Sequence, residues 1–188
     1  KYTEPPQKGE KRVFLKKEAE LPYVLISYHV PNFPDKDSFG LDVMSTILSG
    51  GKSSRLYNKI VNEKRLALNI FADYSGLGID PFIFLFGATA MPGKEIEELE
   101  KAIYDEIKRL QDEPPSEKEV QKAKNQLEAY FIFSQDSNYS KALNVGMFEI
   151  LGDWRLMDKY IEGIKNVTPL DVQDVARRYF SEDNRTVG

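Results

Sequence analysis

The chain has 188 residues, of which 41% are hydrophobic and 30% charged, a composition that predicts one globular domain with a hydrophobic core. Acidic side chains exceed basic ones by 30 to 26, and the resulting net charge of −4 argues against a nucleic-acid-binding role. Cysteine is absent, which excludes disulfides, thiolate zinc sites and a cysteine nucleophile. One histidine, His29, is too few for the common zinc sites, so no metal is expected in this chain.

The two ends of the chain differ in character from the rest. Residues 1–10 are polar and contain Pro5 and Pro6, so we predict an interdomain linker or tail there, followed by one α+β domain over residues 11–188. The first residue is not methionine and the last residues resemble the start of a strand, so we expect a fragment of a longer polypeptide. The sequence has no apolar run long enough for a transmembrane helix, so no membrane contact is expected.

The first half of the chain alternates between β-like and helical patterns. Asp35 or Asp37 is a plausible N-cap for the first helix, and Gly50-Gly51 is expected to end it. In order, the patterns predict strands over 12–16 and 23–30, helices over 38–49 and 53–63, and an antiparallel hairpin of strands over 66–75 and 81–90.

The two strands of this hairpin differ in their pattern. In the first strand, alternation places Asn69 on one face with Ala67, Phe71 and Asp73, and Leu68 on the other face. The second strand is apolar on both faces, which predicts a central strand that is covered on both sides.

The second half of the chain is helical. Ser116 with Glu119 predicts a capping box, and Thr168 with Pro169 predicts the N-cap and first residue of the last helix. The predicted helices cover residues 96–110, 116–131, 138–150, 153–164 and 168–179. The element order is therefore ββ-αα-ββ-ααααα-(β), which indicates an α+β fold with a mostly antiparallel sheet covered by helices on at least one face.

Candidate catalytic motifs are weak in this sequence. Gly51-Lys52-Ser53 resembles the end of a P-loop, but Thr46 stands where that motif requires glycine. His29 has no G-x-S-x-G serine to act with, and a surface histidine explains it better than a catalytic one. We therefore predict no catalytic residue and no metal ligand in this chain.

Several segments, in order, nevertheless resemble a known family over about 170 residues. They are Tyr28-His29-Val30-Pro31, Gly50-Gly51-Lys52-Ser53-Ser54-Arg55-Leu56-Tyr57, Val61-Asn62-Glu63-Lys64-Arg65-Leu66-Ala67, Asp80-Pro81, Pro115-Ser116-Glu117-Lys118-Glu119, Leu151-Gly152-Asp153 and Val167-Thr168-Pro169-Leu170-Asp171-Val172. Together they resemble the second, non-catalytic domain of the insulinase/pitrilysin-type zinc peptidases, the inverzincins that include the mitochondrial processing peptidase.

The resemblance implies a function that depends on a second domain. In this family two similar α+β domains enclose a peptide, and the first carries an H-x-x-E-H helix that holds zinc. This chain would then be the inactive C-terminal domain of a zinc metalloendopeptidase, with zinc in the partner domain and a peptide as substrate. The expected partner is the N-terminal zinc-binding domain of the same polypeptide or a homologous subunit. An apolar docking patch would also allow homo-oligomers to form.

The resemblance also implies two substrate-binding positions. Many family members carry an arginine and, seven residues later, a tyrosine near the peptide chamber. The matching positions here are Asn62 and Asn69, so the usual positive charge is absent. An amide can still hydrogen-bond a peptide backbone. Two alternatives remain: a non-proteolytic scaffold of the same fold, as in the core subunits of the cytochrome bc1 complex, and an independent enzyme that uses His29.

Overall fold

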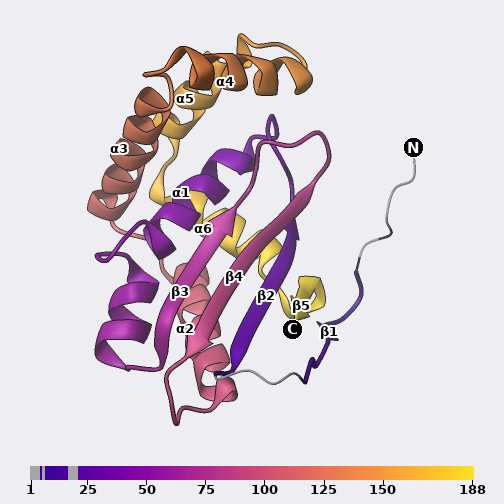
Figure 1. Ribbon diagram of the computed structural model, residues 1–188, viewed down its shortest axis with the longest axis vertical. Coiled ribbons are helices and arrows are strands. Elements are labelled where there is room, and N and C mark those ends of the chain that lie inside the picture. Colours follow the sequence, from indigo (N-terminus) through magenta and orange to yellow (C-terminus); the bar gives the residue numbers. More distant parts are fainter. Residues whose placement is uncertain (1–4, 6, 17–20) are drawn as a thin grey trace.

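The computed structural model describes residues 5, 7–16 and 21–188 and shows one five-stranded sheet with helices (Figure 1). The strands are β1 (Lys11–Arg12), β2 (Tyr23–Val30), β3 (Ala67–Tyr74), β4 (Phe82–Ala90) and β5 (Arg185–Val187). The helices are α1 (Asp37–Ser49), the π-helix η1 (Tyr57–Glu63), α2 (Ile96–Asp112), α3 (Glu117–Phe133), α4 (Asn138–Ile150), α5 (Leu156–Asn166), α6 (Pro169–Tyr179) and the 3-10 turn η2 (Glu182–Asn184). The predicted α+β fold is confirmed.

The strands lie in the order β1-β5-β2-β4-β3, and all neighbouring pairs are antiparallel except β1 with β5. The predicted β3–β4 hairpin is confirmed. Helices α1, α2 and α6 lie behind the sheet in Figure 1, while α3, α4 and α5 extend beyond its upper end. Within the residues described, none of the helices is both long and apolar enough to cross a membrane.

The core lies between the sheet and these three helices. Alternate residues of β2 and β4 point into it, and Phe84 and Phe86 have no exposed surface. The ring of Phe180, which follows α6, packs against both Tyr28 and Phe84, with centroid distances of 4.8 and 4.9 Å. The aromatic contacts therefore join the chain end to the two central strands.

Capping explains where several helices begin. The predicted capping box of Ser116 with Glu119 is present on α3, and α6 begins as predicted with Thr168 as N-cap and Pro169 as first residue. Thr168 also forms a capping box with Asp171. The prediction for α1 was wrong, since its N-cap is Lys36, which makes no side-chain cap. The Asp35 carboxylate still accepts a hydrogen bond from the Asp37 amide at 2.8 Å, which satisfies one free N–H of the first turn.

Three strand predictions are corrected by the structure. The strand expected over 12–16 is limited to the two residues of β1. The pairing of β3 with β4 shifts between Ala67 and Asn69, so Ala67 is buried and Leu68 is 45% exposed, the reverse of the predicted faces. Strand β4 is central, but the helices of the described part of the chain cover only one of its faces.

Two phenylalanines of β4 allow a matched test of the core. Phe84 is fully buried and Phe82 is 55% exposed. We expect Phe84→Ala to lower the free energy of unfolding by about 3–5 kcal/mol, since it opens a cavity between sheet and helices. Phe82→Ala should cost less than about 1 kcal/mol. Urea denaturation of both variants tests this, and equal losses would contradict the described core.

Candidate functional site

The two predicted substrate-binding residues lie on neighbouring elements, η1 and β3. Asn62 is exposed on η1, and its side-chain amide donates to Asn58 Oδ1 at 3.2 Å. Asn69 is exposed on β3, and its Oδ1 accepts a hydrogen bond from Thr89 Oγ at 3.1 Å. Both amides are accessible to a ligand, and neither carries a charge.

The segment between these asparagines has an unusual backbone. The amides of Lys64 and Leu66 bond back to the carbonyls of Lys59 and Ile60, at 3.0 and 2.9 Å. Between them Arg65 adopts φ 51°, the left-handed region that glycine usually fills after a helix. A non-glycine residue costs about 1 kcal/mol or more there. The sequence gives no signal of this strain, and Arg65 was not among the predicted site residues.

Among the residues that the structure describes, no helix lies over one face of the sheet, and we call it the open face. It consists of the outward residues of three strands: Tyr23, Leu25, Ser27 and His29 from β2, Ile83, Leu85, Gly87 and Thr89 from β4, and Asn69, Phe71 and Asp73 from β3. The Phe71 ring lies directly over Gly87, where an added Cβ would come within 2.4 Å of it. Asn69 therefore borders a surface with an aromatic centre and mixed polarity.

A second apolar surface lies on α4, where Phe148 is the only buried residue. We define the α4 surface by its exposed apolar residues, Tyr139, Leu143, Val145, Met147 and Ile150. Tyr139, Leu143 and Ile150 are spaced to lie on one side of the helix and are 74%, 55% and 68% exposed. The helix has only two charged residues, Lys141 and Glu149, so exposure of its apolar side chains to water is unfavourable.

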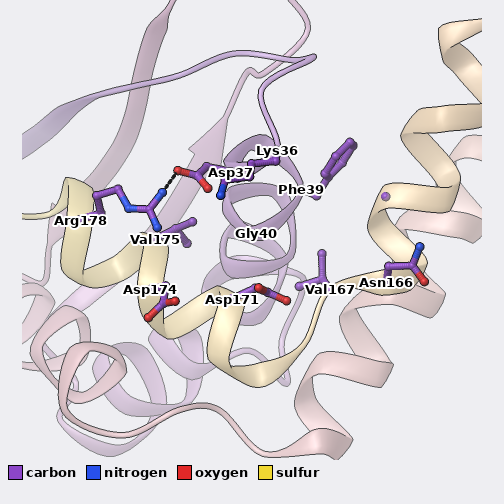
Figure 2. Close-up of a pocket in the computed structure, with 11 residues that line it drawn as sticks. Lys36, Asp37, Phe39, Gly40, Asn166, Val167, Asp171, Asp174, Val175 and Arg178 are labelled. Atoms are coloured by element: carbon purple, nitrogen blue, oxygen red, sulfur yellow. Dashed lines mark hydrogen bonds and ion pairs between the residues drawn. The ribbon is translucent and has the colours of Figure 1, made fainter.

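A pocket of about 320 Å³ lies between α1, α5 and α6 (Figure 2). Arg178 forms an ion pair with buried Asp37 at its edge, and the Tyr179 hydroxyl donates to the same carboxylate at 2.7 Å. Asp171 is used by the α6 capping box. The Asp37–Arg178 pair therefore joins α1 to α6 at the edge of this pocket, while Asp171 stabilises the start of α6.

A partly buried carboxylate, that of Asp42, lies where α1 meets α5. The Tyr160 hydroxyl donates to Asp42 Oδ2 at 2.9 Å. Burial raises the pKa of Asp42 to about 7, against the lowering effect of the Tyr160 hydrogen bond, and the nearby Asp73 charge raises it further. Tyr160 also packs against Phe33 and Phe148, so this contact lies beneath the attachment of α4.

The structure shows no zinc site in the parts of the chain that it describes. Residues 5, 7–16 and 21–188 contain no group of three or more His, Cys, Asp or Glu side chains that could hold a metal ion. His29 lies on the open face, and its backbone carbonyl accepts a hydrogen bond from Asn184 at 2.8 Å. The residues described therefore do not fit the zinc chemistry of a peptidase.

Comparison with known proteins decides the family. The sequence matches the peptidase M16 inactive domain over residues 1–127. The chain belongs to this family. It is 30% identical to the zinc protease PqqE of Helicobacter pylori over 184 residues, which is 97% of this chain and 41% of PqqE.

Solved structures agree with this assignment to the M16 inactive domains. A protease from Helicobacter pylori has a TM-score of 0.91 at 30% identity, over 97% of this chain and 44% of that one. An inactive peptidase domain from Bordetella parapertussis has a TM-score of 0.82 at 27% identity, over 94% and 93%. The chain thus spans less than half of the Helicobacter proteins and nearly all of the Bordetella domain. The expected zinc peptidase family and its inactive domain are confirmed.

The carboxyl of Asp42 predicts a specific pH dependence of stability. Because the pKa of Asp42 is raised in the folded state, the free energy of unfolding falls as the pH rises from about 4 through about 7. Asp42→Asn keeps an acceptor for Tyr160 and removes the titration. We expect its stability relative to wild type to increase by about 1–3 kcal/mol between pH 4 and 8.

Urea denaturation at several pH values measures this difference. Tyr160→Phe removes the hydrogen bond that lowers the pKa of Asp42, so the loss of stability should extend to higher pH in that variant. A difference between Asp42→Asn and wild type that stays constant from pH 4 to 8 would contradict the assignment.

Proposed function

We propose that this domain is the non-catalytic C-terminal half of a zinc metalloendopeptidase and encloses a peptide against a zinc-binding domain. The observation that carries the proposal is a pair of uncovered surfaces in a member of the M16 inactive-domain family, the open face of mixed polarity and the apolar α4 surface. The chain spans 41% of PqqE, so there is room in such a protein for a companion domain of similar size.

The α4 surface supports docking of that companion. Exposed apolar residues that gather on one surface usually mark a protein–protein contact, whereas single ones do not. Tyr130 and Phe133 at the end of α3 are 72% and 68% exposed and belong to the same helical extension as α4. The ion pairs of the domain lie elsewhere, so a partner could bury α4 without breaking any charge pair on it.

The open face supports a role in lining a peptide chamber. It combines apolar side chains such as Phe71 and Leu85 with hydrogen-bonding groups such as Asn69 and Thr89. A peptide needs both kinds of contact, because its backbone amides must be satisfied while its side chains vary. Asn62 and Asn69 would bind such a peptide through their amides, and zinc would be held by the companion domain.

Part of the predicted linker, residues 1–10, contacts this domain. Gln7 donates to the Arg185 carbonyl at 2.7 Å, and Glu10 pairs with the Arg185 guanidinium. Residues 1–4 and 6 lie outside the described residues. We propose that residues 1–10 connect this domain to its companion, with their last part held against β5.

A complementation experiment tests the proposed function. This domain and the zinc-binding half of the same polypeptide are produced separately, and cleavage of a fluorogenic peptide is measured for each alone and for the mixture. We expect activity in the mixture only. Leu143→Glu should weaken association by about tenfold or more, since it places a charge in an apolar contact.

Leu170→Glu is the matched control, because Leu170 is 62% exposed on α6, outside the α4 surface. It should leave association and activity unchanged. Peptide cleavage by the isolated domain with stoichiometric zinc would overturn the proposal. Association of the two halves without any activity would favour the non-proteolytic scaffold.

A further inference from the structure

Arg65 occupies the strained position between the two predicted substrate-binding asparagines. Its φ of 51° is enforced by the hydrogen bonds of its neighbours, Lys64 and Leu66, to the end of η1. Leu66 and Ile60 are buried, at 1% and 0% exposure, so the backbone on both sides cannot move freely. Glycine would fit this position without strain, and the chain nevertheless places a long cationic side chain there.

No contact within the described domain explains this choice. The sequence has eight arginines, and the structure gives every one except Arg65 a hydrogen-bond or ion-pair partner among the residues it describes. The partnered arginines are Arg12, Arg55, Arg109, Arg155, Arg177, Arg178 and Arg185. Arg65 is exposed, so its guanidinium is available to a group outside the domain.

The nearby acidic side chains are already paired with lysines. Glu63 accepts a hydrogen bond from Lys59 at 2.7 Å, and Asp105 pairs with Lys101 at 2.9 Å and lies 3.8 Å from Lys64. Glu63 and Asp105 thus already have lysine partners, and the structure gives Arg65 no carboxylate partner among the residues it describes. A guanidinium presents a planar pair of N–H donors that matches a carboxylate.

We propose that Arg65 binds a carboxylate of the peptide and makes the site selective for acidic peptides. This rests on the proposed function, since it requires that a peptide lies against this side of the domain. The Asn62 and Asn69 amides would then bind the peptide backbone, and Arg65 would supply the positive charge that those two positions lack. The carboxylate is either an acidic side chain or the C-terminal group.

The test uses the full-length protein that contains this domain. Peptides of one length and sequence carry a single Glu moved along the chain or Gln in its place, each with a free or an amidated C terminus. Binding is measured by fluorescence anisotropy and cleavage by kcat/KM. We expect at least one carboxylate-bearing peptide to be favoured about tenfold over its neutral match, and Arg65→Gln to remove that preference.

Further variants separate recognition from folding. Arg65→Lys should retain part of the preference, because it keeps the charge and loses the paired donors. Arg65→Gly should raise Tm by relieving the backbone strain while losing the preference, a combination that a purely structural role would not produce. Lys118→Gln, an exposed cation on α3, is the control and should change neither property.

The outcomes are distinguishable. A full-length protein that binds and cleaves neutral and acidic peptides equally would overturn the role of Arg65 and leave the proposed function standing. A preference that survives in Arg65→Gln would also overturn it. A protein that binds none of the peptides would refute the proposed function and this inference together. Discrimination by the Glu position or by C-terminal amidation identifies which carboxylate is bound.

Discussion

The α-helices that pack on the sheet, α1, α2 and α6, lie on the same face of it, and this one-sided packing governs the rest of the structure. The inward residues of β2 and β4, among them Tyr28, Phe84 and Phe86, form the core with α1, α2 and α6. The outward residues of the same strands include apolar side chains such as Leu25 and Leu85, and no helix of the described residues lies over them. Because a single antiparallel sheet can be stable with one solvated face, the domain can fold while its second face stays available.

Helix α4 is likewise packed on one side and uncovered on the other. One buried residue, Phe148, holds this helix to the domain through contacts with Phe33 and Tyr160, while most of its apolar side chains face outward. Both the sheet and the helical extension thus have uncovered apolar surface, and the proposed companion domain accounts for both at once. The partly buried Asp42–Tyr160 contact lies beneath this attachment, which links the stability of the extension to pH.

Sequence patterns predicted the elements whose causes are local. The capping box of α3, the N-cap of α6, the strand β2 and the hairpin follow from side-chain type and period, and the structure has them. The bulge after Ala67, the π-helical turn and the left-handed Arg65 depend on how η1 packs against β3, which no short-range pattern encodes. The apolar pattern of β4 predicted that both of its faces are covered, and in the part of the chain that the structure describes helices cover one face. Asn62 and Asn69 were found only through family resemblance, and their role stays a prediction.

Hydrogen–deuterium exchange tests the central claim most directly, that the apolar surfaces outside the core are covered in the complete protein. The isolated domain and the full-length protein are compared amide by amide. We expect the amides of α4 to exchange about tenfold or more slowly in the full-length protein, while α2, whose apolar side is already buried here, exchanges equally in both. Equal exchange of α4 in the two proteins would contradict the account.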